Sequence, residues 1–320
     1  MARKLRFTIA AAVLASALVF TACSTQAEPG GSTAGGGGDG GIKVGAAFPI
    51  LDQFLQNVAD GMEAEAAQQG IELTVVAADE KADKQLSQVE NFISQGMDAI
   101  LVVPVDTDAA GPMTSAAQGA EIPLVYVNRR PSELPAGVPY VGSDSLVSGQ
   151  LQMEELARLA EGKGNVVILQ GDPANEAARL RTQGCQEIVD KNPEMEVIKT
   201  QAGNWYREEG LSIMENWLQS GDQIDIVCAN NDEMALGAVQ ALKTAGQLDK
   251  VLVGGVDATP DALAAMEAGE LEVTVFQDAK GQGGGGVQAA VSLINGEMVE
   301  DYVDVPYQLV TPDNLADFKS

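Results

Sequence analysis

The sequence predicts an α/β fold made of two Rossmann-like lobes, each containing a parallel sheet. Short apolar runs alternate with segments of helical periodicity, and the connections between them are brief. This alternation is typical of parallel sheets whose two faces are covered by helices. The series occurs twice, and apolar residues make up 45% of the 320 residues, which is enough for two separate cores.

The first series begins at residue 42. Its strands are expected at residues 43–48, 72–77, 99–103, 124–127 and 140–141. Its helices are expected at residues 54–69, 84–95 and 109–118. Right-handed crossovers place every strand-to-helix loop on the same side of a parallel sheet.

The second series repeats the pattern. Its strands are expected at residues 165–169, 197–200, 224–228, 251–256 and 273–276. Its helices are expected at residues 149–159, 177–189, 208–219, 233–245 and 260–267. Two such units that face each other form a cleft, and ligands of open α/β sheets bind at the carboxyl ends of the strands.

Residues 226–237 join a buried strand to a helix. The apolar run stops at Asn230, and helical periodicity begins at Glu233. We expect Asp232 to be the N-cap, because its carboxylate can accept a free N–H of the first helical turn. Asn231 would then remain free to face the cleft with its amide.

Composition excludes several classes of function. Histidine is absent, which removes Ser-His-Asp and Cys-His catalysis and histidine-ligated zinc. Lysine and arginine total 19 against 46 acidic residues, for a formal charge of −27. Nucleic-acid binding requires a cationic surface, so nucleic acid is not an expected partner. We expect neither enzymatic activity nor a cofactor or bound metal.

The amino terminus has the pattern of an export signal. A basic start precedes an apolar stretch at residues 7–20, which is too short to span a bilayer comfortably. Residues 20–23 (Phe-Thr-Ala-Cys) resemble a bacterial lipobox, which implies that residues 1–22 are removed and that Cys23 is lipidated. Residues 23–41 are rich in Gly and Ser and read as a tether. The alternative is an ordinary cleaved signal peptide with a coincidental cysteine.

The stretch IVCANNDEMALG at residues 226–237 closely resembles the ribose/galactose-type periplasmic sugar-binding proteins of bacterial ABC transporters. The resemblance covers essentially all of residues 42–311, and it implies a type I periplasmic binding protein. By the family's pattern, the first lobe would comprise residues 42–143 and 278–306, and the second residues 144–277 and 307–320. The chain would cross between the lobes three times, forming a hinge near Ser143, Gln277 and Pro306.

The same resemblance implies a set of ligand-binding residues. Phe54 and Trp205 match positions that sandwich a sugar ring, and the other members match positions that contact it or its hydroxyl groups. Two arginines and two aspartates leave this set near neutral, which favours an uncharged ligand. The full set is Asp52, Phe54, Leu55, Asn128, Arg129, Arg179, Trp205, Asn231, Asp257 and Gln277.

Three positions depart from the ribose-type pattern. Asp52 stands where Asn is typical, Leu55 replaces a second aromatic residue, and Asn128 replaces an Asp. The sequence at these positions looks like the cyclitol (myo-inositol) binders of the same superfamily. The expected ligand is therefore a small neutral sugar or polyol, with ribose, xylose and galactose also open. The implied role is a monomeric extracytoplasmic receptor that touches the membrane only through its lipid and serves an ABC permease.

Other interpretations were also open. A receptor for an autoinducer or chemoattractant would have the same fold and capture its ligand by closure of the same hinge. A sugar-responsive repressor would need a helix-turn-helix where the export signal lies, and a nucleoside hydrolase would be a third class.

Residues 281–286 satisfy G-x-G-x-x-G, but a helix start beside the hinge is the better account. Cys185 lies in an expected helix and Cys228 in an expected strand, so two buried thiols are the default expectation. A disulfide could form instead if their Cα atoms lie within about 7 Å, and the sequence leaves this open.

Overall fold

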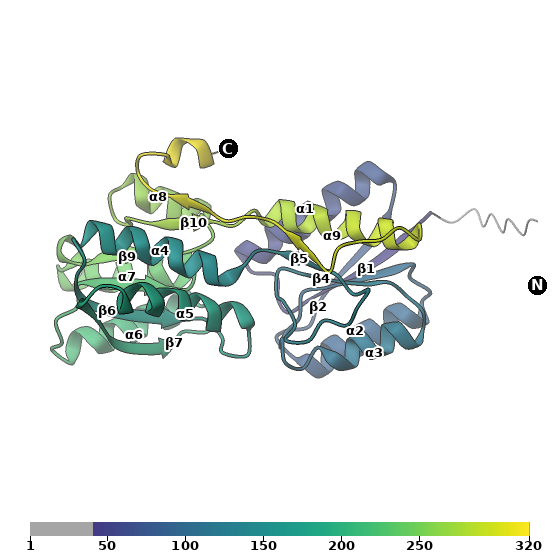
Figure 1. The fold of residues 1–320 in the computed structure, drawn as a ribbon, viewed down its shortest axis with the longest axis horizontal. Coiled ribbons are helices and arrows are strands. Elements are labelled where there is room, and N and C mark those ends of the chain that lie inside the picture. Colours follow the sequence, from purple (N-terminus) through teal and green to yellow (C-terminus); the bar gives the residue numbers. More distant parts are fainter. Residues whose placement is uncertain (1–40, 320) are drawn as a thin grey trace, which may run out of the picture. The chain divides into compact units, whose positions relative to one another are not determined.

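The computed structural model describes residues 41–319, which form two lobes, each with a parallel sheet (Figure 1). The expected signal peptide, the lipidation site Cys23 and nearly all of the tether lie outside the described residues. Within the described part of the chain, no helix has the length and apolar character needed to cross a membrane.

The sheet of the first lobe has six parallel strands in the order β11-β5-β4-β3-β1-β2. These are β1 (Lys43–Phe48), β2 (Glu72–Ala77), β3 (Ala99–Val102), β4 (Leu124–Val127), β5 (Tyr140–Gly142) and β11 (Tyr302–Asp304). One face is covered by α1 (Gln53–Gln69) and α9 (Ala279–Ile294), and the other by α2 (Ala82–Ser94) and α3 (Gly111–Gly119). The edge strand β11 was not predicted, because it is short and pairs only with the distant β5.

The sheet of the second lobe has four parallel strands in the order β7-β6-β8-β9. These are β6 (Lys163–Gln170), β7 (Glu194–Ala202), β8 (Ile226–Ala229) and β9 (Leu252–Gly254). Isolated bridges join the β9 segment to the region of β10 (Thr274–Phe276), which pairs antiparallel with β12 (Gln308–Val310). Two short 3-10 helices, η1 (Leu248–Lys250) and η2 (Leu315–Phe318), complete this lobe.

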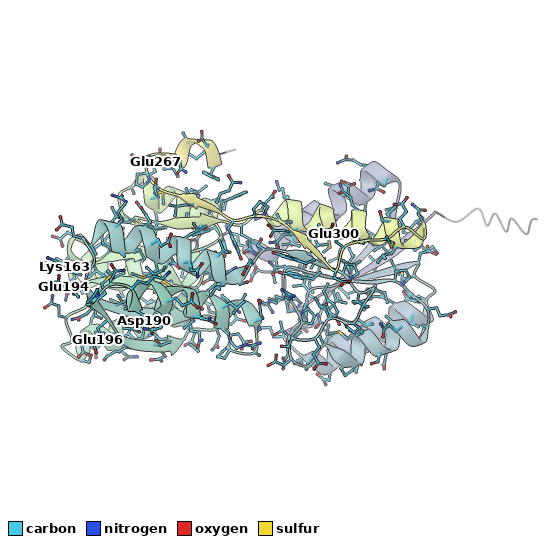
Figure 2. All side chains as sticks on the ribbon, viewed as in Figure 1. Lys163, Asp190, Glu194, Glu196, Glu267 and Glu300 are labelled. Atoms are coloured by element: carbon cyan, nitrogen blue, oxygen red, sulfur yellow. A yellow bond between two sulfur atoms is a disulfide. The ribbon has the colours of Figure 1, made fainter. Side chains whose placement is uncertain are left out.

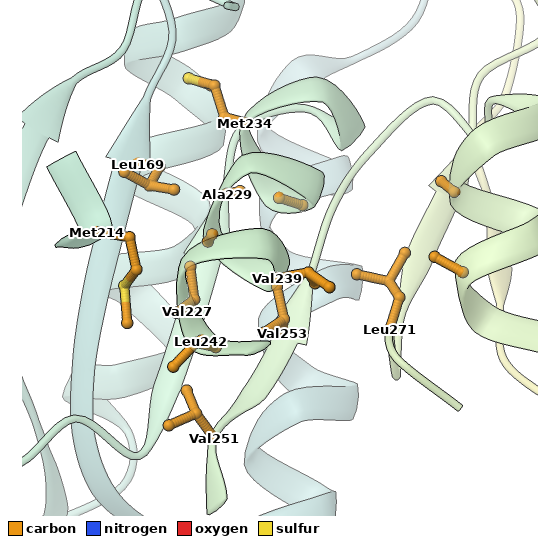
Figure 3. Close-up of a cluster of buried hydrophobic side chains, with 14 of the residues drawn as sticks. Leu169, Met214, Val227, Ala229, Met234, Val239, Leu242, Val251, Val253 and Leu271 are labelled. Carbon is orange, nitrogen blue, oxygen red and sulfur yellow. The ribbon is translucent and has the colours of Figure 1, made fainter. Parts of the chain in front are cut away.

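Helices cover both faces of the second sheet. The helices on one face are α4 (Ser145–Leu159) and α5 (Glu176–Asp190). Those on the other are α6 (Arg207–Gln219), α7 (Asp232–Ala245) and α8 (Pro260–Glu267). Figure 3 shows Val239 and Leu242 of α7 beside Val227 and Val253 of the strands, and Met234 belongs to the same buried cluster. The α7 periodicity predicted from the sequence therefore describes a real buried face.

Glycine residues allow the paired helices to approach closely. A Cβ atom on Gly283 of α9 would clash with the Val58 carbonyl of α1, and one on Gly61 would clash with the backbone of Lys280. The G-x-G-x-x-G run at residues 281–286 lies at the start of α9, as expected, and it also forms a surface on which α1 packs. The same device places α4 against α5, where Gly149 meets the carbonyl of Arg181.

The chain passes between the lobes at three places: from β5 to α4, from β10 to α9, and from β11 to β12. Two of these segments are bonded to each other, because the Ser143 hydroxyl donates to the Val305 carbonyl. Gln282, which is fully buried in α9, donates to the Ser143 oxygen at 2.9 Å. Hydrogen bonds from Ser143 and Gln282 thus link the segments that connect the two lobes.

Cys185 and Cys228 form a disulfide, with their Cα atoms 6.8 Å apart. The bond joins α5 to β8, and both sulfur atoms are buried in the core between these elements. The question that the sequence left open is therefore answered by the packing of α5 on the sheet.

Acidic side chains are exposed on the outer surface of the second lobe. Asp190, Glu194 and Glu196 lie near β7 in Figure 2, and all three are exposed. Lys163 lies 3.9 Å from Glu194, and both side chains are mostly exposed. This surface faces solvent, so its exposed ion pair contributes little to stability.

Candidate functional site

The carboxyl ends of strands from both lobes meet at a small, partly open cavity with a volume of about 50 Å³. Nine of its eleven lining residues belong to the set implied by the sequence resemblance. The first lobe contributes Asp52, Phe54, Leu55, Asn128 and Arg129. The second contributes Ala177, Arg181, Trp205, Asn231, Asp257 and Gln277.

Arg179 does not line this cavity, and its place is taken by Arg181. The Arg179 guanidinium donates to the Pro173 carbonyl at 2.7 Å and to the Asp108 carboxylate at 3.1 Å, with a partly exposed side chain. Arg181 lies on the buried face of α5 together with Ala177, Ala178, Gly184 and Cys185. The prediction of Arg179 was wrong because residues two apart on a helix point in nearly opposite directions.

Arg181 is the most highly connected side chain of the cavity. Its Nη1 donates to the Asn230 carbonyl at 2.7 Å, and its Nη2 donates to Gln277 Oε1 at 2.9 Å and to the Tyr307 hydroxyl at 3.0 Å. Its Nη1 also lies 3.8 Å from Asp257 Oδ1. The Nε atom is buried and has no hydrogen-bond partner within the protein.

Asp257 is a buried carboxylate held on an unusual backbone. Its φ is 125° and that of Ala258 is 53°, and both values lie in regions that favour glycine. Burial raises the pKa of Asp257 well above its usual value, and the positive charge of Arg181 opposes this shift. Such backbone strain persists only where the surrounding structure enforces it, which is typical of binding sites.

Asn231 lines the cavity, but it is also the N-cap of α7. Its Oδ1 accepts from the Met234 N–H at 3.0 Å, and its Nδ2 donates to the Trp205 carbonyl at 3.1 Å. The prediction that Asp232 caps this helix was wrong. Asp232 is fully buried behind the cavity, where it accepts hydrogen bonds from Thr259 and Thr274. Burial raises the pKa of Asp232 to about 7, against the effect of these hydrogen bonds.

The wall of the first lobe is polar. Asp52 caps α1 by accepting from the Leu55 N–H at 2.8 Å, so one carboxylate oxygen is already occupied. Asn128, with φ of 65°, donates through Nδ2 to Gln282 Oε1 at 2.8 Å. Arg129 donates to the Pro104 carbonyl at 3.2 Å, and burial lowers its pKa while the Asp52 charge opposes that shift.

Two aromatic residues contribute apolar surface from opposite lobes. Phe54 lies in the first turn of α1, and Trp205 precedes α6 with φ of 75°. The indole packs so closely on Gly171 that a Cβ there would clash with it, and the Arg181 guanidinium lies 5.7 Å from the ring centroid. The buried Nε1 atom of Trp205 also has no partner within the protein.

The lobes also touch beside the cavity. The Thr107 hydroxyl of the first lobe donates to the Ala174 carbonyl at 3.0 Å and accepts from the Glu176 N–H at 3.1 Å. It thus satisfies a free N–H at the start of α5, whose own N-cap residue Asn175 makes no side-chain capping bond. Arg179 strengthens this contact through Asp108.

The site is suited to binding a small polar guest. Arg129 and Arg181 balance Asp52 and Asp257 in charge, so the near-neutral lining expected from the sequence persists with the corrected arginine. Arginine, amide and carboxylate groups can donate to and accept from neighbouring hydroxyl groups. Among residues 41–319, no cluster of three His, Cys, Asp or Glu side chains could hold a metal ion.

A polar cavity between two α/β lobes, with the lobes joined by three crossings, defines the class of solute-binding proteins. The periplasmic binding protein domain matches residues 48–298. The chain belongs to this family, whose members act outside the cytoplasm and bind solutes rather than transform them.

Individual relatives agree with this assignment. A Rhizobium meliloti protein assigned to rhizopine binding is 47% identical over 284 residues, covering 86% of this chain and 92% of that protein. The xylitol-binding protein of Mycolicibacterium smegmatis is 35% identical over 291 residues, covering 89% of this chain and 83% of that protein. The structure of an ABC transporter solute binding protein from Bacillus halodurans with bound myo-inositol matches with a TM-score of 0.86 and 45% identity. It covers 88% of this chain and 99% of that one.

Proposed function

We propose that this protein captures a neutral cyclitol of the myo-inositol class, or a closely similar sugar or polyol, for uptake by an ABC permease. The observation that carries the proposal is the charge-balanced cavity, in which arginine, carboxylate and amide groups converge from both lobes. A polyol with hydroxyl groups around its ring offers both donors and acceptors to such a lining. The myo-inositol bound to the Bacillus halodurans relative supports this choice of ligand class.

Capture proceeds by closure of the two lobes. The lobes are residues 42–143 with 278–306, and residues 144–277 with 307–320. A ligand that touches Asn128 and Arg129 on one side, and Arg181 and Asp257 on the other, stabilises the closed arrangement. The contact of Thr107 with the start of α5 adds polar bonds to the same arrangement.

The ligand class is tested by thermal unfolding and titration calorimetry of the purified protein against myo-inositol, xylitol, ribose, xylose and galactose. A ligand at about 100 times its dissociation constant should stabilise the fold by roughly 2.7 kcal/mol. Glucuronate is the charged control, and the balanced cavity is expected to reject it because a carboxylate adds an uncompensated charge. Absence of stabilisation by every neutral compound would overturn the proposal.

The protein acts as a monomer that is held at the outer face of the cell membrane by lipid on Cys23. This part of the proposal rests on residues 20–23 and on the Gly/Ser-rich segment that follows. Lipoprotein processing supplies more than one acyl chain, which stable anchoring requires.

The lipid anchor is tested by Cys23→Ser in a bacterial host. The wild-type protein should sediment with membranes and incorporate labelled fatty acid, whereas the variant should do neither and still bind myo-inositol. Label on the Cys23→Ser protein, or its absence from the wild type, would contradict the anchor.

A further inference from the structure

A buried carboxylate lies directly behind the cavity without lining it. Asp232 is fully buried at the start of α7. Its Oδ2 accepts from the Thr259 N–H at 2.8 Å, and its Oδ1 accepts from the Thr274 hydroxyl at 2.7 Å. Both partners are distant in the sequence, on the segment before α8 and on β10.

These bonds enclose the strained segment that carries Asp257. The Thr274 oxygen also accepts from the Ala258 N–H at 3.1 Å, so Asp232 is bonded directly to Thr259 and, through Thr274, to Ala258. Asp257 and Ala258 both have positive φ, a conformation that relaxes unless its neighbours enforce it. The carboxylate of Asp232 therefore supplies restraints on the two residues that follow Asp257.

The backbone from Val256 to Asp257 is also held by hydrogen bonds. Asp232 N–H donates to the Val256 carbonyl at 2.8 Å, and Asp257 N–H donates to the Val275 carbonyl at 2.8 Å. Gly255 leaves room for the Asp232 carboxylate, because a Cβ there would clash with Oδ1. The segment from Gly255 to Thr259 therefore packs against Asp232 and is hydrogen-bonded to it.

We propose that Asp232 is a positioning residue for Asp257: by holding Ala258 and Thr259, it aims the Asp257 carboxylate at the ligand. The inference rests on the proposed function, in which Asp257 contacts the ligand. A purely structural role for Asp232 would stabilise the fold without acting through Asp257. The two roles differ in whether the effects of substituting Asp232 and Asp257 on affinity are independent.

A double-mutant cycle separates these roles. The dissociation constant for myo-inositol is measured by calorimetry for the wild type, Asp232→Ala, Asp257→Ala and the double variant. When Asp257 is intact, we expect Asp232→Ala to raise the dissociation constant by about tenfold. When Asp257 is already alanine, the same change should raise it by less than about twofold, because the effects of substituting residues that act as one unit do not add. Thr274→Val, which removes the link to Ala258, should behave in the same way and replaces Asp232→Ala if that variant does not fold.

Two further variants complete the test. Asp232→Asn should recover most of the affinity, because its oxygen can accept from Thr259 while its amide donates to the Thr274 oxygen. Asp225→Ala is the matched control: Asp225 directly precedes β8, at the end of the strand remote from the cavity, and accepts from the Asn165 N–H at 2.8 Å. This control should lower the unfolding temperature and leave the dissociation constant within about twofold.

The possible results separate failure of the positioning role of Asp232 from failure of the proposed binding function. If Asp257→Ala binds myo-inositol as tightly as the wild type, the proposed site and this inference both fail. If Asp257→Ala weakens binding but Asp232→Ala weakens it by the same factor in both backgrounds, the positioning role is overturned and the proposed function stands. Loss of the effect in the Asp257→Ala background supports the positioning role.

Discussion

Replacing Arg181 with alanine is expected to abolish measurable ligand binding and to destabilise the fold. The change removes a buried cation that lies 3.8 Å from Asp257 and donates to Gln277 and Tyr307. Removing one partner of a buried ion pair typically costs about 3–5 kcal/mol, because the other charge is left uncompensated. The pKa of Asp257, which Arg181 holds down, should rise further and favour the neutral acid. Calorimetry with myo-inositol and thermal unfolding measure the two effects.

Arg179→Ala is the matched control for this experiment. Both arginines lie on α5, but Arg179 is partly exposed and pairs with the exposed Asp108. An exposed ion pair contributes about 0–1 kcal/mol, so the affinity should change by no more than about fivefold. Arg181→Lys keeps the charge without the planar fork and should be intermediate. If Arg179→Ala were as damaging as Arg181→Ala, the assignment of Arg181 to the cavity would be wrong.

Loss of the disulfide should produce the second large effect, on stability. Cys185 and Cys228 are separated by 43 residues. In the chain-entropy description, closing a loop of this length stabilises the native state by about 4 kcal/mol. Reduction, or the pair of changes Cys185→Ala and Cys228→Ala, should therefore lower the free energy of unfolding by about this amount.

Chemical denaturation with and without a reductant measures this effect. The wild type should unfold at lower denaturant concentration when reduced, whereas the double alanine variant should be insensitive to the reductant. The slope of the transition reports whether the unfolded chain has become more extended. An identical midpoint for the reduced and oxidised wild type would contradict a stabilising disulfide.

Most of the strands and helices could be predicted from local pattern. The apolar runs of β1 to β4 and the periodicity of α7 appear where expected, because each element buries a face whose period is visible in the sequence. The short strands β11 and β12 were missed, since each has only three residues and depends on a partner far along the chain. Helix starts were less certain, and α4 begins four residues earlier than expected because Asp144 caps it.

The error at Arg179 had a visible warning in the sequence. Ala177, Arg181, Cys185 and Ile188 recur at the spacing of one helical face, so Arg181 is a charged residue on an otherwise apolar stripe. A charge in such a place needs a buried partner, which is a sign of a site. The position of Arg181 on the apolar face of the helix would have identified it, and not Arg179, as the arginine of the cavity.

The roles of Asn231 and Asp232 could not be separated by local rules. Both residue types are good N-caps, and they are adjacent. Asp232 lies inward because Thr259 and Thr274 offer it two donors, and these come from segments 27 and 42 residues further along the chain. Asn231 then takes the cap and still faces the cavity.

Residue types and their periodicity were sufficient to predict the parallel α/β class, the absence of histidine chemistry and the polar groups at the strand ends. Those properties depend on neighbours along the chain. The pairing of the cysteines, the choice of Arg181 and the strained backbone at Asp257 depend instead on contacts between distant segments. Only the packed tertiary structure decides them, because the partners of each group are brought together by folding.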